Sequence, residues 1–353
     1  MEQMGAAAEW TGTFSKISFQ SDESNLNRIA TITDIDKDDG RRRIVGTPNM
    51  NCLCKALVMN RENDGITTQF GSRVRKIIFD YEQRKWMLHI AGDRVPGSSE
   101  TSDRIEGPFD GIVAADKLLA SDSVKRLFKD EWPLYYVGRD SDGNMLDNRT
   151  DNGGITNIIK GMRTITSTPS FVLMLELKRP LSTEGSSQSN IFDGAIVENS
   201  ETVAWIANNS SKPGRDNSSE SVQRWVLQST AEFATKKLDD SGEALRKLKR
   251  GSEEYNLAFK KIGDEMFDVF GKVMLGLYNI QDIEVKSMTV HRWGSAFPLC
   301  GNGEENNDMI LSDHTMKIVS CGDWTRSPNV EGAILSGLDA GDKLSEMLLK
   351  DDH

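Results

Sequence analysis

The C-terminal part of the chain constrains the fold most strongly. Residues 316–321 (MKIVSC) form a short apolar run that predicts a strand, and Gly322 and Asp323 follow it directly. A Ser/Pro/Asn turn comes next, and from Val330 to about residue 349 apolar residues recur at helical spacing. The order of strand, turn and helix predicts an α/β unit at this end of the chain.

The predicted helix has an unusual glycine content. Ser327 can cap it and Pro328 suits its first turn. Gly332, Gly337 and Gly341 lie inside it, each at a cost of about 1 kcal/mol relative to alanine. A neighbouring strand or a bound cofactor must therefore approach the helix backbone closely. The residues predicted to face inward are Val330, Ile334, Leu338, Leu344 and Leu348.

The start of this helix has two interpretations. A helix N-terminus offers unpaired N–H groups and about half a positive charge to an electron-rich ligand. Asp323, at the end of the preceding strand, could accept hydrogen bonds from a sugar-like hydroxyl. Alternatively, Asp323 only caps the turn, and the glycines only permit the helix to pack on the sheet.

The remaining chain predicts further strands and helices and shows no repeat. A helix is expected near residues 51–58 and an antiparallel strand pair at 73–79 and 86–90. The predicted strands, helices and loops are: a strand within 109–115 that is buried on both faces, a strand at 171–177, a hairpin from 195–197 and 203–206, helices at 222–238 and 253–277, and polar loops at 92–107, 139–154 and 212–221.

Charge and composition narrow the class of protein. The formal net charge is −11, and an acidic excess disfavours duplex nucleic acid as a partner. No apolar run reaches the roughly 18 residues of a membrane span, so no membrane partner is expected. No secretory leader opens the sequence, and a soluble intracellular protein is expected; cytoplasm and plastid both stay open, because any targeting segment would precede Met1. The four cysteines, which we expect to be reduced, are Cys52, Cys54, Cys300 and Cys321.

The chain offers no metal-ligand set, Ser/His/Asp set or paired carboxylates. Its four histidines are scattered along the sequence, and His89 is expected on a strand face. The sequence therefore assigns no catalytic residue and no metal site.

Several segments, in order, resemble one family. Cys321-Gly322-Asp323-Trp324 followed by 329–337 (NVEGAILSG) closely resembles the C-terminal flavin motif of renalase-like FAD-dependent oxidoreductases, within the amine-oxidase superfamily. The other segments that match the family's patterns are 45–50 (VGTPNM), Arg73-Val74 with its hairpin, 109–113 (FDGIV), 209–215 (NSSKPGR), His291-Arg292-Trp293 and 296–298 (AFP).

The resemblance implies a flavoprotein of the FAD/NAD(P)-binding, amine-oxidase type, with FAD as cofactor. One domain would hold FAD, and an antiparallel sheet with helices would form a substrate domain above the flavin ring. It implies that Asp323 binds the ribityl chain, that backbone N–H groups near Val330, Glu331 and Gly332 face the flavin, and that Val74 contacts the adenine through its backbone. Asn329 belongs to the same motif. Trp293 and Trp324 are candidates to line the flavin or substrate cavity, or are core aromatics.

One family feature is missing from the sequence. Such proteins begin with a βαβ unit whose G-x-G-x-x-G turn holds the FAD pyrophosphate, and no G-x-G-x-x-G occurs here. Residues 9–14 (EWTGTF) instead resemble the family segment that follows that unit, so we expect an N-terminally truncated form. Segments 1–45 and 117–298 are expected to form the substrate domain, and 46–116 and 299–353 the FAD domain.

Two functions remain open at this stage. The first is an FAD-dependent oxidoreductase that transfers hydride from an amine-like or dihydronicotinamide donor, including forms of NAD(P)H, to flavin, with reoxidation by O2. The second is a truncated non-catalytic remnant, or an interaction module, that binds no FAD. Without the pyrophosphate cradle, the affinity for a doubly charged group should fall, and neighbouring strands should keep unpaired edges.

Overall fold

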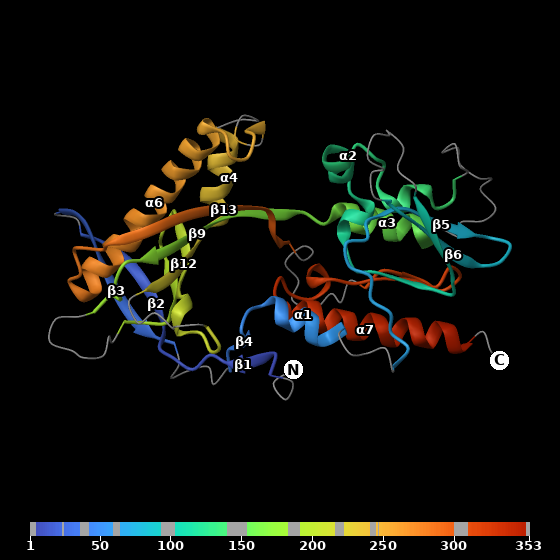
Figure 1. The fold of residues 1–353 in the computed structure, drawn as a ribbon, viewed down its shortest axis with the longest axis horizontal. Helices are drawn as coiled ribbons and strands as arrows, with labels where there is room; N and C mark the ends of the chain where they lie inside the picture. The colour runs from blue at the N-terminus through green and yellow to red at the C-terminus, as the bar shows by residue number, and fades with distance from the viewer. Residues whose placement is uncertain are drawn as a thin grey trace. The chain divides into compact units, whose positions relative to one another are not determined.

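The protein has a mixed α/β fold, which confirms the predicted fold class (Figure 1). The structure is a computed structural model, and it describes residues 5–22, 25–35, 42–58, 64–92, 103–139, 154–182, 191–215, 222–240, 245, 247–299 and 310–350. Two compact units are present: unit 1 is Met1–Thr68 with Thr168–Ala296, and unit 2 is Gln69–Ser167 with Phe297–His353. The chain thus changes unit after residues 68, 167 and 296, whereas the sequence predicts boundaries after 45, 116 and 298.

Unit 1 is built on a seven-stranded sheet with the strand order β13-β9-β12-β11-β10-β2-β3. The β10–β2 pair is parallel, and the pairs β2–β3, β10–β11, β11–β12 and β12–β9 are antiparallel. The sheet is therefore largely antiparallel. The strands are β2 (Phe14–Asp22), β3 (Asn25–Asp34), β9 (Ser167–Leu177), β10 (Gly194–Glu198), β11 (Val203–Asn208), β12 (Gln223–Ser229) and β13 (Val285–Pro298).

Two helices complete the core of unit 1. Helix α6 (Glu253–Tyr278) confirms the helix predicted at 253–277, and it packs with α4 (Ala231–Asp240) on the sheet (Figure 1). Strand β9 alternates as a half-buried strand should, since Leu173 is fully buried and Met174 is 41% exposed. Phe270 of α6 is fully buried in the same cluster. Side chains of the sheet, α4 and α6 therefore form one apolar cluster.

The helix predicted at 222–238 is wrong in its first half. Residues 223–229 form strand β12, and the helix α4 begins only at Ala231. Trp225 and Leu227 are fully buried while Arg224 is exposed, which is the period-two alternation of a strand. The same residues also fit a helical stripe, so the hydrophobic pattern alone did not separate the two. Thr230 marks the boundary, because its Oγ1 accepts the Phe233 N–H at 3.1 Å.

A short ribbon and a helix complete the N-terminal part of unit 1. Strand β1 (Ala7–Glu9) pairs antiparallel with β4 (Ile44–Gly46), and the Thr47 N–H extends the pairing to the Ala6 carbonyl at 3.0 Å. The predicted helix near 51–58 is confirmed as α1 (Asn51–Val58), which buries Leu53.

Unit 2 contains two three-stranded sheets. One is an antiparallel meander of β5 (Val74–Asp80), β6 (Lys85–Ile90) and β7 (Arg104–Phe109), and it confirms the predicted pair at 73–79 and 86–90. The other has the order β14-β15-β8, from Ser312–Asp313, Ile318–Ser320 and Ile112–Ala114, and its β15–β8 pair is parallel. Three short helices belong to the same unit: η2 (Lys117–Ala120), α2 (Ser123–Phe128) and η3 (Pro133–Tyr136).

The two sheets of unit 2 share one apolar core. Trp86 of β6 is fully buried, and its Nε1 donates to the Met316 carbonyl at 2.6 Å. Helix α3 (Gly154–Thr164) adds Ile158 and Met162 to this cluster. The C-terminal segment is therefore fixed to the meander by a buried hydrogen bond as well as by packing.

Two predictions for residues 92–115 need correction. Residues 104–107 belong to β7 and not to a loop, while 93–102 lie outside the described residues. The strand predicted within 109–115 shortens to β8 and is not buried on both faces, because Val113 is 40% exposed. The physical reason is position, since β8 lies at the edge of its sheet in the described part of the chain. The predicted loops at 139–154 and 212–221 lie largely outside the described residues.

The predicted C-terminal helix is confirmed as α7 (Val330–Leu349), but its buried face differs from the prediction. Val330 is 48% exposed and Leu338 is 62% exposed, so these two do not face inward. The fully buried positions near them are small, namely Ser336 and Ala340. Small side chains allow the helix to lie close to β15, which explains why this face and not the leucine face is buried. The preceding strand is also shorter than predicted.

Candidate functional site

The candidate site lies where two parallel strands of unit 2 end. Because β8 and β15 run parallel, the segments that follow them emerge at the same edge of the sheet. The Cys321 N–H donates to the Ala114 carbonyl at 3.1 Å, which fixes the two ends side by side. Lys117 follows β8 and Asp323 follows β15. The edge of a sheet where strand ends meet is a common position for ligand sites in α/β proteins.

Gly322 directs the chain out of β15 into this edge. Its φ of +154° lies in a region that is essentially restricted to glycine. A Cβ at this position would lie 2.1 Å from Cζ3 of Trp324, so the indole ring covers the Gly322 backbone. The Gly322 carbonyl accepts the Thr325 N–H at 3.0 Å and the Thr325 hydroxyl at 2.8 Å. The Gly-Asp-Trp sequence is therefore a defined turn in which the glycine is required.

Asp323 and Lys117 set the electrostatics of the edge. Burial raises the pKa of the Asp323 carboxyl, and the positive charge of Lys117 opposes that rise. Burial likewise lowers the pKa of Lys117, opposed by Asp323 and Asp116. The Lys117 ammonium also donates to the hydroxyl of Ser167. A partly buried carboxylate with a nearby ammonium can accept hydrogen bonds from ligand hydroxyls without leaving an uncompensated charge.

The N-terminus of α7 is capped from within the chain. Asn329, and not the predicted Ser327, is the N-cap, and its Oδ1 accepts the Gly332 N–H at 2.7 Å. Ser327 has a different role, because a Cβ on Gly332 would lie 2.2 Å from the Ser327 carbonyl oxygen. Close approach thus explains Gly332. A Cβ added at Gly337 or Gly341, in contrast, would meet no atom of a neighbouring element within 4 Å among the described residues. Of the three N–H groups assigned to a ligand by the resemblance, the cap occupies that of Gly332.

Two polar side-chain atoms at this edge are buried without a hydrogen-bond partner in the described residues. These are Nε1 of Trp324 and the hydroxyl of Ser320. Trp324 itself is only 6% exposed. Unsatisfied buried polar atoms cost about 1–3 kcal/mol each, so their presence beside Asp323 points to a polar ligand that would supply the partner.

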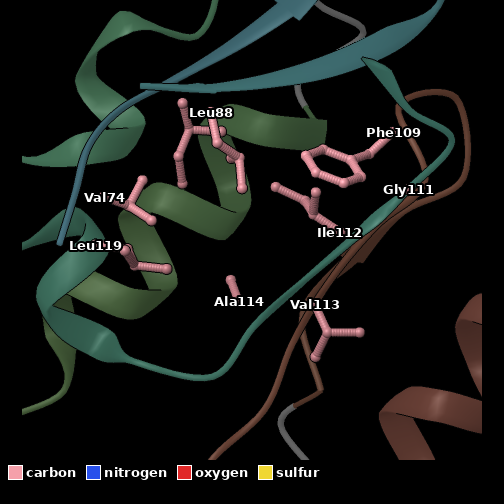
Figure 2. Close-up of a pocket in the computed structure, with 9 residues that line it drawn as sticks. Val74, Leu88, Phe109, Gly111, Ile112, Val113, Ala114 and Leu119 are labelled. Carbon is pink, nitrogen blue, oxygen red and sulfur yellow. The ribbon is translucent and has the colours of Figure 1, made fainter. Parts of the chain in front are cut away.

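An apolar cavity of about 250 Å³ borders the same strands (Figure 2). Figure 2 shows Val74, Leu119 and Ala114 around this space, with Val113 on the same strand as Ala114, β8. The lining residues are Val74, Ile77, Leu88, Phe109, Gly111, Ile112, Val113, Ala114 and Leu119. The cavity therefore meets the polar edge through β8, whose last residue is bonded to Cys321.

The structure brings most of the predicted site residues together in unit 2. Asp323, Trp324, Asn329, Val330, Glu331 and Gly332 lie in one continuous segment from the end of β15 to the first turn of α7. Val74 lies in the adjoining cavity. Trp293 belongs to unit 1, on β13, and is 53% exposed. That exposure excludes a core role for Trp293, whereas Trp324 is buried.

Sequence reasoning missed Lys117. The signal that could have identified it is its position, because it directly follows the predicted strand at 109–115, and parallel strands end at the same edge. Its partner Ser167 is 50 residues away in sequence, so no local pattern joins them. In the described part of the chain, no cluster of three or more histidine, cysteine or acidic residues could hold a metal ion.

No family model matches the sequence. Among solved structures, the chain is similar to a protein assigned as a protoporphyrinogen oxidase from Exiguobacterium sp. 255-15, at 9% identity and a TM-score of 0.47, covering 89% of this chain and 54% of that one. An oxidoreductase from Methanosarcina mazei follows at 11% identity and a TM-score of 0.45, with coverages of 85% and 55%. A putrescine oxidase has 10% identity and a TM-score of 0.42, with coverages of 87% and 54%.

The chain thus spans about half the length of these solved structures. TM-scores below 0.5 do not establish a relationship, so the functional argument rests on the chain's own residues. In the described residues, no helix is both long and apolar enough to cross a membrane.

The described residues fit one half of FAD. Asp323 can accept hydrogen bonds from ribityl hydroxyls, and the N–H groups of Val330 and Glu331 point out of the start of α7. Trp324 Nε1 is a buried donor in need of an acceptor. No residue described here supplies a glycine-rich pyrophosphate loop. The fit therefore concerns the flavin and ribityl portion of the cofactor.

Proposed function

We propose that the protein is an FAD-dependent oxidoreductase of the renalase and amine-oxidase type. The observation that carries the proposal is the Gly322-Asp323-Trp324 turn. It places a partly buried carboxylate, an unpartnered indole N–H and the start of α7 at the shared end of two parallel strands. A sugar-like polyol chain attached to an aromatic ring matches that combination of groups.

Each residue has a distinct part in this proposal. Asp323 would bind ribityl hydroxyls, and Lys117 would keep Asp323 ionised by opposing the effect of burial on its pKa. The N–H groups of Val330 and Glu331 would stabilise negative charge on the flavin ring, as a helix N-terminus does for any anion. Val74 would contact the adenine from the apolar cavity. Trp293 remains a predicted lining residue of the substrate cavity.

Bound flavin would supply the redox chemistry, which is hydride acceptance from an amine-like or dihydronicotinamide donor followed by reoxidation by O2. The protein would bind the flavin, orient the donor towards it and adjust the charge around the ring. The substrate would be a small molecule, and NAD(P)H forms are among the proposed donors. A soluble intracellular location, in the cytoplasm or a plastid, stays a prediction.

A second candidate is an interaction module that binds no FAD. The observation that favours it is the open edge of β8 in the described part of the chain, together with the lack of a G-x-G-x-x-G turn in the sequence. An unpaired strand edge can pair with an extended segment of another protein. This candidate predicts a folded protein that does not bind flavin.

Flavin titration of the full chain and matched variants tests the choice. FAD is added at fixed ionic strength while flavin fluorescence and induced circular dichroism are followed. We expect Asp323→Ala to weaken FAD binding about tenfold, the loss expected for one charged hydrogen bond. Asp342→Ala is the control, since Asp342 lies on an exposed position of α7.

The outcomes separate the two candidates. Equal affinity for Asp323→Ala and wild type would contradict the assigned site, and a folded wild type that binds no flavin would favour the interaction module. If FAD binds, peroxide production from amines and from dihydronicotinamides then identifies the class of donor.

A further inference from the structure

A second polar cluster lies in unit 1, where the segment after β11 meets the turn after β4. Residues 212–215 (KPGR) form a tight turn, in which the Arg215 N–H donates to the Lys212 carbonyl at 3.3 Å. Proline at the second position and Gly214 at the third, with a φ of +71°, are the requirements of a type II turn. The ends of such a turn lie within about 7 Å of each other. Two cationic residues, Lys212 and Arg215, are therefore held side by side.

Thr47 packs directly on this turn. A Cβ on Gly214 would lie 2.3 Å from Cγ2 of Thr47 and 3.3 Å from Cα of Pro48, so the glycine is needed for the contact. The hydroxyl of Thr47 and Nε of Arg215 are both buried, and neither has a hydrogen-bond partner in the described residues. Two segments that are about 165 residues apart thus meet, and each carries one buried polar atom without a partner in the described residues.

The Lys212 side chain lies over the ring of Trp10. Its ammonium is 5.0 Å from the centroid of the Trp10 ring, which is only 6% exposed. Trp10 is itself held in place, because its Nε1 donates to the Ser211 hydroxyl at 3.0 Å. The ammonium is therefore positioned by a fixed ring and not by a carboxylate.

No ion pair joins Lys212 or Arg215 to a carboxylate in the described part of the chain, although such pairs are frequent elsewhere in unit 1. Two acidic residues on neighbouring segments have partners of their own. Glu9 accepts from Arg42 Nε at 2.9 Å, and Asp193 accepts the Thr13 N–H at 2.9 Å. The cluster thus carries two positive charges and a hydroxyl without a compensating acid among the described residues.

The lack of a carboxylate partner affects the pKa of Lys212. Burial, and then the charge of Arg215, lower the pKa of Lys212 to about 8. A bound anion would reverse both effects, since it would neutralise the pair and satisfy the Thr47 hydroxyl and the Arg215 N–H.

We propose that Lys212, Arg215 and Thr47 form a binding site for a small oxyanion, the phosphate or carboxylate group of a ligand. All three lie in unit 1, so this proposal does not rest on the proposed function of unit 2. The Lys212 ammonium and the Arg215 guanidinium can only donate, and the Thr47 hydroxyl can donate as well, which favours an acceptor-only group. Trp10 closes one side of the site and limits the access of water.

Calorimetric titration of the full chain with inorganic phosphate and, separately, with acetate tests the proposal and distinguishes the two sources of the oxyanion. Ionic strength is held constant with chloride, because screening alone changes the effective charge. Lys212→Met and Arg215→Gln remove one charge each with little change of shape. Thr47→Val removes only the hydroxyl and remains informative if a charge variant fails to fold.

Lys237→Met is the matched control. Lys237 also lies over an aromatic ring in unit 1, 5.2 Å from the centroid of Phe233, but it has a carboxylate partner in Glu265 at 2.7 Å. We expect saturable one-to-one binding of at least one anion that weakens about tenfold in Lys212→Met and Arg215→Gln. Thr47→Val should weaken it about threefold, and Lys237→Met should leave it unchanged.

Lysine acetylation gives a second readout that does not depend on the heat of binding. At pH 8, Lys212 should react faster than Lys237 with an acetylating reagent, and the preferred anion should protect Lys212 selectively, as measured by mass spectrometry. Absence of saturable binding by both anions, equal affinity in the Lys212 and Arg215 variants, or no protection of Lys212 would each overturn the proposal.

Discussion

The cores of unit 1 and unit 2 differ in how completely they are closed. In unit 1, the parallel pair β2–β10 lies inside a seven-stranded sheet, and α4 and α6 cover the buried residues. In unit 2, the parallel pair β8–β15 ends at the open edge of β8, next to a cavity of about 250 Å³. The difference indicates that the sheet core of unit 1 is closed by packing, whereas the core of unit 2 leaves room for an apolar group.

Removing a large side chain from each core tests this contrast with the largest expected effect. Phe270→Ala empties a fully buried position in unit 1 and should lower the free energy of unfolding by about 3–5 kcal/mol. Ile112→Ala, beside the existing cavity of unit 2, should cost less than half as much, because fewer contacts are lost. Urea denaturation measures both, and equal costs would contradict the contrast.

Two glycines of unit 2 allow a second test, of how closely its elements pack. Gly322→Ala forces a side chain into a strained backbone region and against Trp324, so we expect a loss of about 2 kcal/mol. Gly341→Ala, with open space around it in α7, should instead stabilise the protein by about 0.5–1 kcal/mol. Thermal unfolding of the two variants checks the opposite signs. Destabilisation by Gly341→Ala would show that something does approach that face of α7.

The cap of α7 is a smaller effect. Asn329→Ala removes the bond to the Gly332 N–H and should cost about 1 kcal/mol. Asn329→Asp keeps an acceptor at the same position and should retain most of the stability. If Asn329→Ala unfolds at the same urea concentration as wild type, the side chain does not hold the start of the helix.

A pH dependence of stability is expected in unit 1. The folded state lowers the pKa of Lys212 to about 8, so between that value and the ordinary lysine pKa the unfolded chain binds more protons. The free energy of unfolding therefore rises with pH through that window. Below the window Lys212 is protonated in both states, and this gain in stability is absent. Lys212→Met should abolish the rise, whereas Lys237→Met should keep it. Urea midpoints measured from pH 7 to about pH 10 provide the comparison.

The sequence predicted the features that depend on local pattern. The order of strand, Gly322-Asp323 turn and α7 followed from apolar spacing and turn residues, and so did the β5–β6 pair. Residues within ten or twenty positions of one another determine these elements, and over that range periodicity and turn residues are informative.

The errors came where tertiary packing decides between two local solutions. Residues 223–229 fit a helical stripe and a strand alternation equally well, and only the neighbouring strands β9 and β11 select the strand. The buried face of α7 includes the small residues Gly332, Ser336 and Ala340 together with Met347, and a hydrophobic pattern does not reveal the small ones. Lys117 and the cluster of Lys212 with Thr47 depend on contacts between distant segments.

We propose that the edge formed by β8, β15 and α7 holds a flavin. The most direct measurement is the visible absorption spectrum of the purified 353-residue chain, recorded before and after denaturation. We expect flavin absorption in the native protein and release of flavin in near-stoichiometric amount on unfolding. A folded chain that is colourless, and that stays colourless after incubation with excess FAD and removal of the unbound cofactor, would contradict it.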